Sequence, residues 1–503
     1  MKIIVQEKSL ILLKLFNIML YKKVFFILIH ASLICSSLLF LACERSVITQ
    51  NFSAELFEPC MILNLEQNNT IEGNYITVIE ANHIKKYIEI SIPENFYINS
   101  RNFKNWVVGW GDNKPLYDAG VENICEIKKI NIRKCRIFLG DLKRGKGFPT
   151  KNQRIVFWNT QPSGYIHVKN KPIVETSLWP EFHGNSISFG SIEFDEKLKK
   201  WVMLVNECDT DSIQIYAAVS QNLINWSAAK KGKPILTVSA FKNCQWAGWD
   251  QTGKIRQTPM VTDILRHKNK WYIFLNGYDK DGLRHIGLAI STGSLLGPFE
   301  IQKNPILSPG NPGLWDDSAV FYAKVKPYKN KFILFYDGKN TDNYERIGMA
   351  ISKDLISWKK SSKPVLDEHT GWRSAKFCTE PNYIEIRNDT IFLMVAGVKE
   401  FKMGFWHHYI TKRMYMDKSG NVNDAQLGIF RSIDGGKTFV AHKNNPVFVN
   451  DYTNKHENEH MGGNFKFIEL DTVKYFFYQA KSSFEGSKYN IMLRKKSLSN
   501  KRY

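Results

Sequence analysis

The sequence predicts an all-β chain: a five-bladed β-propeller preceded by a small β-rich N-terminal region. Three observations support this fold class. Residues 313–366 hold four short strand-like segments, a proline-hydrophobic signal occurs five times after residue 147, and a turn ending in an aromatic residue precedes four of those copies. Four short antiparallel strands in a repeat of about this length are typical of one propeller blade.

The best-defined repeat opens on Trp315, Asp316 and Asp317, which lead into an apolar run. Asp317 therefore stands at the mouth of the first, innermost strand. β-branched and aromatic residues predict three further strands, at 330–338, 346–352 and 363–366. Between the last two, the turn Ser352–Trp358 places a short polar side chain where it can bond its own backbone.

The proline signal is Lys-Pro or Asn-Pro followed by two hydrophobic residues, and it marks the outer strand of each repeat. Its copies begin at Pro172, Pro234, Pro305, Pro364 and Pro446, 59 to 82 residues apart. The last repeat, 465–498, lacks an outer strand, and segment 165–174 could supply it and close the ring without an open edge. Residues 154–159 resemble one more strand, so six blades stay an alternative.

The first 43 residues predict an export signal. Basic residues precede an apolar run from Val24 to Ala42, and Leu39–Cys43 resembles the lipobox of bacterial lipoproteins, whose cysteine is lipidated after cleavage. Phe40 stands where a lipobox usually has Leu, so a retained membrane anchor and a plain signal peptide stay open. Lipidation at Cys43 would anchor the chain to a membrane of the cell envelope, in the periplasm or on the outer surface.

These patterns divide the chain into a signal segment (1–43), a β-rich region of unknown role (44–146) and the propeller (147–503). Runs at 75–79, 87–91 and 105–110 predict strands in the β-rich region, compatible with a sandwich-like module. The six cysteines after Cys43 contain no CxxC pair, which excludes the usual zinc frameworks. A Cys125–Cys135 bridge is compatible with an exported protein.

Composition indicates a globular protein with a basic surface. Hydrophobic residues make up 43% and aromatic residues 13%, enough for a large core. The net charge of +21 favours acidic partners. Because the lysines are scattered over turns and strand ends, we interpret them as a solvated surface and expect no nucleic-acid partner.

In a propeller the first strand of each blade lines the axis, so polar residues at the heads of these strands converge on one pocket. Ionisable groups stand there in four of the five repeats, whereas the second repeat has Thr258 and Pro259. The candidate carboxylates are Asp316, Asp317 and Glu380. The candidate substrate-binding residues are His183, Trp315, Arg373, Glu459 and His460, with Trp315 offering an aromatic face to a sugar ring.

Five blades, the Ser-x-Asp-Leu-x-x-Trp turn at 352–358 and strands such as 270–277 resemble the propeller glycosidases of families 43, 32, 62, 117 and 130. The resemblance covers about residues 147–498. These families place a base or nucleophile Asp, a second Asp that orients and tunes it, and a general-acid Glu on inner strands. By this resemblance Glu380 corresponds to the acid and Asp317 to the second Asp. Thr258 stands where the base is expected, so Asp316 or Asp317 acts as the base, another blade supplies one, or the activity is lost.

The resemblance implies a glycoside hydrolase that cleaves a polysaccharide or oligosaccharide with two carboxyl groups and without a cofactor. No metal site is expected, although the cluster His456–His460 could bind a cation. Two alternatives remain: a noncatalytic carbohydrate-binding propeller, and a glycoside phosphorylase or transferase. The latter needs a basic phosphate-binding corner, for which Arg256, Arg284 or Arg373 could serve. Local turn bonds remain the competing explanation for Asp316, and strand-end amide bonds for Glu380.

Overall fold

The computed structural model describes residues 76–91, 106–110, 120–131, 134–144, 148–152, 154–159, 165–208, 213–249, 258–367, 380–402, 421–442, 460–482 and 488–498, with residues 445, 447, 448, 454, 456 and 457. The expected signal segment with Cys43 lies outside these residues. The regular elements described are strands and short 3-10 helices such as η5 (Thr176–Leu178). Within these ranges, no helix has both the length and the apolar character needed to cross a membrane.

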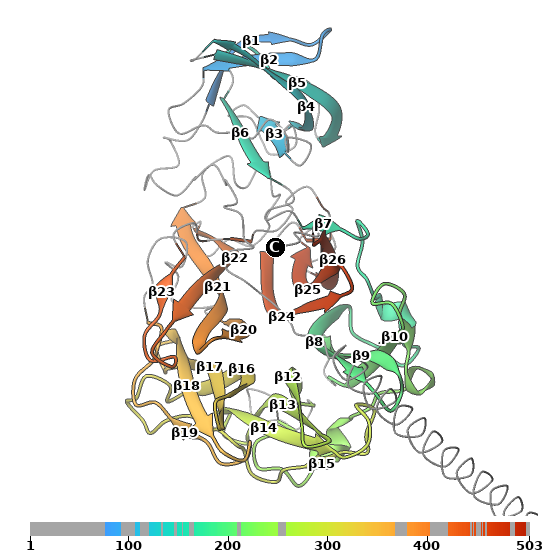
Figure 1. The fold of residues 1–503 in the computed structure, drawn as a ribbon, viewed down its shortest axis with the longest axis vertical. Helices are drawn as coiled ribbons and strands as arrows, with labels where there is room; N and C mark the ends of the chain where they lie inside the picture. The colour runs from blue at the N-terminus through green and yellow to red at the C-terminus, as the bar shows by residue number, and fades with distance from the viewer. Residues whose placement is uncertain are drawn as a thin grey trace, which may run out of the picture. The chain divides into compact units, whose positions relative to one another are not determined.

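The first six strands form a closed barrel in the order β1-β2-β5-β4-β3-β6 (Figure 1). Their bounds are β1 (Ile76–Asn82), β2 (Tyr87–Ser91), β3 (Trp106–Trp110), β4 (Gly120–Asn131), β5 (Lys134–Arg144) and β6 (Arg154–Asn159). The three strands predicted in this region are present, in a barrel instead of a sandwich. β6 pairs with both β1 and β3, so the strand at 154–159 closes the barrel and is not an extra blade strand. The expected boundary at 146 therefore falls before the last barrel strand.

Cys135 lies in β5 as a buried free thiol. Burial raises the pKa of this thiol to about 11, which keeps it protonated at neutral pH. Because Cys135 is a free cysteine, the structure does not contain the Cys125–Cys135 bridge that the sequence left open.

The remaining strands form one sheet of eight strands and three sheets of four. The first four-stranded sheet holds β8 (Ser186–Asp195), β9 (Lys200–Cys208), β10 (Ile215–Ser220) and β11 (Ser227–Ala228). The eight-stranded sheet holds β12 (Met260–His267), β13 (Lys270–Tyr278), β14 (Arg284–Ser291), β15 (Glu300–Ile301), β16 (Ala319–Tyr328), β17 (Lys331–Lys339), β18 (Glu345–Ser352) and β19 (Lys359–Lys360). One parallel pair, Arg284 with Ala319, joins its two antiparallel halves.

The next four-stranded sheet holds β20 (Pro381–Arg387), β21 (Thr390–Lys402), β22 (Asn421–Ser432) and β23 (Val440–Ala441). The last sheet holds β24 (His460–Leu470), β25 (Val473–Ser482), β26 (Lys488–Ser497) and β7 (Ile166–His167). β7 pairs antiparallel with β26, which confirms that segment 165–174 supplies the missing outer strand.

The proline signal occupies the same place in every repeat. The residue two positions after the proline makes a single bridge to the third strand, at Val174, Leu236, Leu307, Leu366 and Phe448. The outer strand is therefore shorter than expected: a two-residue strand followed by an isolated bridge. Proline explains the break because it has no backbone N–H to donate to the ladder.

The turn Ser352–Trp358, which precedes the outer strand β19, is held by its own polar side chain. Oδ1 of Asp354 accepts the backbone N–H groups of Ile356 (2.9 Å) and Ser357 (2.8 Å). The bond from Ser357 is the main cause that lowers the pKa of Asp354. The Trp358 indole donates to the carbonyl of Leu355 at 3.0 Å, so the aromatic residue closes the turn. The predicted role of this motif is confirmed as structural.

The strands β8, β12, β16, β20 and β24 are the innermost strands of their groups around one centre (Figure 1). Hydrogen bonds between them cross the centre: Asn464 of β24 donates to the carbonyls of Phe189 in β8 and Val261 in β12. The buried Lys324 of β16 donates to the side chain of Asn464 at 2.6 Å. Burial lowers the pKa of Lys324 to about 8. Polar side chains thus tie the inner strands together across the axis.

Candidate functional site

Glu380 lies directly before β20 and is half-buried. Its Oε2 accepts the backbone N–H of Gly463 at 2.6 Å, and the side chain of Asn382 donates to it at 3.5 Å. Gly463 has φ +77, and a Cβ there would meet the Gln479 side chain at 2.9 Å, so glycine is required. Burial raises the pKa of Glu380 to about 7, although the Gly463 N–H opposes the shift.

Asp317 is half-buried at the head of β16, as its place in the sequence predicted. Its two carboxylate oxygens accept backbone N–H groups, Oδ2 from Gly313 at 2.7 Å and Oδ1 from Thr341 at 3.0 Å. These bonds fix the orientation of the carboxylate. They also fasten the loop before β16 to the turn between β17 and β18.

Asp316 is buried, with 2% of its surface exposed. Its Oδ2 accepts the Tyr336 hydroxyl at 3.0 Å and contacts Lys360 Nζ at 2.7 Å. Trp315 stacks on the Tyr336 ring at 5.7 Å between centroids, and a Cβ at Gly338 would meet its ring at 2.3 Å. Asp316 and Trp315 therefore contact Tyr336 and stabilise the segment that leads into β16.

The structure places a second buried acid, Asp337 at the end of β17, in the electrostatic surroundings of Glu380. Asp337 is 0% exposed, and neither of its oxygens has a hydrogen-bond partner. Burial, then the charges of Glu345 and Glu380, raise the pKa of Asp337 well above its usual range, while Arg284 opposes this. The sequence analysis placed Asp337 inside the predicted strand 330–338 and did not name it as a candidate. The sequence did contain a signal for a buried acid here, because Asp337 directly follows five apolar residues.

Arg284 supplies the positive charge of this cluster. Its guanidinium lies 4.3 Å from the Phe321 ring centroid and 5.5 Å from that of Tyr322. Tyr322 has φ 50, a left-handed conformation at the bulge of β16. Non-glycine residues in this region store strain of order 1 kcal/mol and are found at functional sites. Arg284 was predicted only as one option for a phosphate-binding corner.

The heads of the other repeats hold a mixture of predicted and unexpected groups. His183 is exposed, and its backbone N–H, with that of Gly184 at 2.9 Å, donates to Oε1 of Glu207. Glu207 is 0% exposed, and its Oε2 has no partner, so it is a second acid that the sequence analysis missed. Thr258 is buried, and its hydroxyl also has no partner.

Four residues named in the sequence analysis have no described side chain. Arg373 and Glu459 lie outside the described residues, as does Arg256, and His460 is described only as the first backbone position of β24. Within the His456–His460 cluster, Glu457 is fully buried against Arg494. Among the residues with described side chains, no group of three His, Cys, Asp or Glu is arranged to hold a metal ion.

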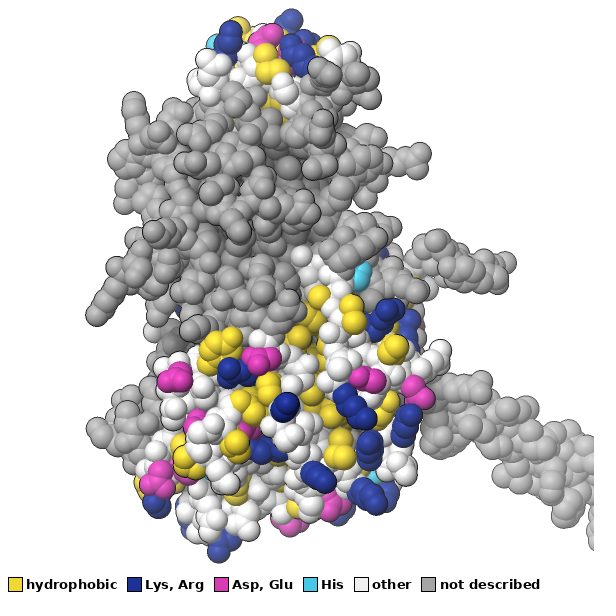
Figure 2. Space-filling view, turned by 90° about the vertical axis from the view of Figure 1, so that its left-hand side faces the viewer, with side chains coloured by type: hydrophobic (Ala, Val, Ile, Leu, Met, Phe, Trp, Pro, Cys, Tyr) yellow, Lys and Arg dark blue, Asp and Glu magenta, His cyan; other side chains and the backbone are white. Residues whose placement is uncertain are grey.

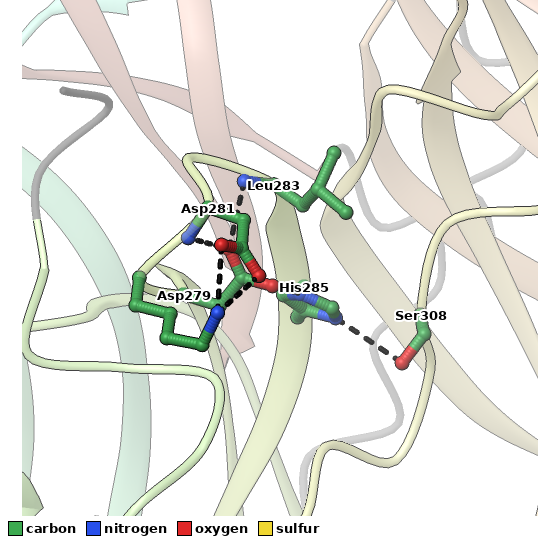
Figure 3. A network of polar contacts seen from close by, with 6 residues as sticks. Asp279, Asp281, Leu283, His285 and Ser308 are labelled. Carbon is green, nitrogen blue, oxygen red and sulfur yellow. Dashed lines mark hydrogen bonds and ion pairs between the residues drawn. The ribbon is translucent and has the colours of Figure 1, made fainter. Parts of the chain in front are cut away.

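A polar chain outside the predicted set runs from the hairpin turn at Asp279 through His285 to Ser308 (Figure 3). His285 contacts Asp279 Oδ2 at 2.9 Å through Nε2 and Ser308 Oγ at 3.1 Å through Nδ1. The carbonyl of Ser308 accepts Lys360 Nζ at 2.9 Å, and the same Nζ contacts Asp316. This chain positions the head of β16 from the neighbouring repeat.

Comparison with known proteins gives one local sequence match and several similar structures. No family model matches the chain. A β-1,2-mannobiose phosphorylase of Thermoanaerobacter sp. (strain X514) is 38% identical over 79 residues, 13% of this chain and 26% of that protein. The chain thus matches about a quarter of the length of this relative.

The similar solved structures include glycoside hydrolases. A thermostable family-43 glycoside hydrolase is 15% identical, with 65% of this chain and 97% of that chain covered and a TM-score of 0.45. A structure from work on family-130 mannoside phosphorylases and glycoside hydrolases that target β-1,2 mannosidic linkages in Candida mannan is 12% identical, covering 66% and 93%, with a TM-score of 0.47. A glycosyl hydrolase from Bacteroides ovatus is 13% identical, covering 66% and 93%, with a TM-score of 0.47.

Proposed function

We propose that this chain is a carbohydrate-active enzyme that cleaves a glycosidic bond, with Glu380 as the proton donor. The observation that carries the proposal is the state of Glu380. It lies at the head of an inner strand, it is held by the Gly463 N–H, and its pKa of about 7 keeps much of it protonated near neutrality. The local match to a mannobiose phosphorylase supports the same class of chemistry.

The proposed reaction uses two carboxyl groups, one as a proton donor and one as a base or nucleophile. Glu380 gives its proton to the glycosidic oxygen as the bond to the anomeric carbon breaks. An ionised carboxylate either removes a proton from the water that attacks the carbon, or attacks the carbon itself; in the second case water, deprotonated by Glu380, then cleaves the glycosyl-enzyme bond. We assign this second role to Asp317, whose oxygens are oriented by Gly313 and Thr341, with Asp316 as the competing candidate.

The scaffold that carries these groups is proposed to be a five-bladed propeller. Each half of the eight-stranded sheet counts as one blade, because a single parallel pair joins the halves. The propeller then runs from about residue 165 to residue 498, after the barrel.

Phosphorolysis is the second candidate, and the mannobiose phosphorylase match favours it. In that reaction inorganic phosphate replaces water at the anomeric carbon, and the product is a sugar phosphate. Arg284, in the same electrostatic cluster as Glu380, supplies a fixed positive charge for an anion. The non-enzymatic alternative is a propeller that binds carbohydrate without cleaving it.

The test incubates the purified full-length chain with β-1,2-mannobiose and with mannan, arabinan, xylan, fructan and agar fragments, with and without phosphate. Release of reducing sugar alone indicates hydrolysis, and release of sugar phosphate only with phosphate indicates phosphorolysis. Glu380→Gln should lower kcat about 10²- to 10⁴-fold, the usual contribution of a general acid. The loss should be much smaller on an aryl glycoside, whose leaving group needs no proton.

Glu300→Gln is the matched control, because Glu300 is an exposed carboxylate on an outer strand. It should keep full activity. Equal activity of Glu380→Gln and the parent chain would refute the assignment of the acid. Binding of a glycan without turnover in any condition would favour the noncatalytic alternative.

A further inference from the structure

A groove lies between the end of the first four-stranded sheet and the outer strand β15. Its walls are the segments 230–236, 240–244 and 296–303, and its volume is ≈ 810 Å³. Sites for small molecules usually measure about 300–1,000 Å³, so the groove is large enough to hold a ligand. None of the candidate catalytic residues lines it.

The floor of the groove is apolar and preformed. Ile235, Leu296, Phe299 and Ile301 are partly buried and pack on the core cluster that contains Trp246. One side-chain bond and one backbone bond join the residues that follow 240–244 to the wall 296–303: the Trp246 indole donates to the carbonyl of Gln302 at 2.9 Å, and the Gln245 N–H donates to that of Lys303 at 3.1 Å. A floor already ordered loses little conformational entropy when a ligand binds.

The wall segment 296–303 is held in place by β8, the inner strand of the preceding sheet. Oδ2 of the buried Asp195 accepts the Ser294 hydroxyl at 2.7 Å and the Leu295 N–H at 2.8 Å. These bonds hold the turn that carries Leu296 and Phe299. The groove therefore does not depend on exposed side chains for its shape.

The rim carries charge of one sign. Lys230, Lys233 and Lys303 are exposed around the groove, and its fourteen lining residues include no Asp or Glu. Lys230 has φ 50, so the chain holds it in a left-handed conformation at the rim. By contrast, acidic side chains lie among the lysines and arginines on the face shown in Figure 2. The charged side chains that line the groove are thus all positive, which favours an anionic ligand.

We infer that this groove binds a segment of an anionic polysaccharide, separately from the candidate catalytic site. Carboxylate or sulfate groups of the polymer contact the three lysines, and the C–H faces of its sugar rings lie on Phe299 and the aliphatic floor. The concave floor excludes a flat bilayer surface. A single-stranded nucleic acid would need successive aromatic rings for its bases, and Phe299 is the only ring that lines the groove.

The test measures binding of the purified full-length chain to polygalacturonate at 50 mM NaCl by affinity electrophoresis. The triple variant Lys230→Gln/Lys233→Gln/Lys303→Gln should weaken binding at least tenfold. Phe299→Ala should weaken it several-fold, because the sugar faces lose their platform. Fully methyl-esterified polygalacturonate, which has the same backbone without charge, should bind the parent chain at least tenfold more weakly.

The control is Lys268→Gln/Lys270→Gln/Lys363→Gln, which removes the same charge from exposed lysines outside the groove. This variant should bind within twofold of the parent chain. Equal losses in both triple variants would show an effect of net charge and overturn the inference. So would tighter binding of RNA or anionic vesicles that is lost with the groove lysines. Turnover of a small glycoside should be the same in all lysine variants, so this test is independent of the proposed function.

Discussion

At the scale of single residues, burial decides in which direction the pKa of a carboxyl group shifts. Asp354 and Glu380 are both acids at a turn or strand end, yet the pKa of one falls and that of the other rises. Asp354 is exposed and accepts backbone N–H groups, which favour its charged form. For Glu380, loss of water outweighs the one short N–H bond that it accepts.

We predict that activity falls on the alkaline side as Glu380 loses its proton. A general acid works only while protonated, and the pKa of Glu380 is about 7. The ratio kcat/KM should therefore decline about tenfold per pH unit above pH 7. The pH profile on a substrate with a poor leaving group measures this. A profile that stays level to pH 9 would contradict the role of Glu380.

Asp337 should make the folded protein less stable as pH rises. In the unfolded chain this carboxyl ionises above about pH 4. In the folded chain burial keeps it protonated, so stability declines from that pH upward toward its raised pKa. Asp337→Asn cannot ionise, and its melting temperature relative to the parent should be higher at pH 8 than at pH 4.

The exposed Asp342 provides the control for this measurement. Asp342→Asn should follow the melting temperature of the parent chain at both pH values. If Asp337→Asn does the same, then Asp337 is not held protonated by the fold.

At the scale of elements, the last sheet depends on one buried ion pair. Glu457 and Arg494 are both 0% exposed and lie 2.8 Å apart, and the Tyr478 hydroxyl is 2.8 Å from Arg494 Nε. His167 of β7 also contacts Glu457, at 3.2 Å. Burial alone would raise the pKa of Glu457, but Arg494 and then His167 lower it to about 2. This network links β7 to β25 and β26 within the last sheet.

We expect Arg494→Met to destabilise the chain by about 3–5 kcal/mol, because it leaves the Glu457 charge buried and unpaired. Glu457→Gln/Arg494→Met should cost less than this single change. The pair stabilises the parent chain above about pH 4.5, and this contribution should disappear as pH falls toward 2. Urea unfolding at pH 7 and pH 3 measures both effects.

The exposed pair of Lys280 and Asp281 is the control, since surface pairs contribute about 0–1 kcal/mol. Lys280→Met should change the free energy of unfolding by less than about 1 kcal/mol. A similarly small change in Arg494→Met would mean that the buried network does not hold this sheet.

At the scale of the whole molecule, the N-terminal segment carries the sequence pattern that bears on where the protein is located. Its basic residues, apolar run and Cys43 match an exported lipoprotein. We therefore propose that the mature chain is anchored to a membrane of the cell envelope through a lipid on Cys43.

Cys43→Ala should abolish incorporation of labelled fatty acid and should move the protein from the membrane to the soluble or uncleaved fraction. Metabolic labelling followed by fractionation measures this. Cys244→Ala is the control, because Cys244 is a free cysteine outside the segment. Labelling that persists in Cys43→Ala would refute lipidation at this residue.

The sequence by itself determined the repeats, because their signals are local. An alternating apolar run, a proline without an N–H and a polar turn residue each act within a few neighbours along the chain. The proline signal at Pro364 predicted an outer strand, and the structure has a bridge there at Leu366. The sequence also predicted that segment 165–174 completes the last repeat, and β7 pairs with β26. The position of Glu380 before an inner strand followed from the same reasoning.

Only the tertiary structure decided which of these groups interact. Asp337 is separated by 43 residues from Glu380 and by 53 from Arg284, and no local pattern connects them. Their electrostatic interaction arises because residues from different repeats come near one another in a partly buried region, where charges interact more strongly than in bulk water. The barrel closure through β6 was likewise decided by pairing partners far away in sequence. Interactions between neighbouring residues thus determine the strands and turns of this protein. Which residues come together in one site is determined by packing between segments that are far apart in the sequence.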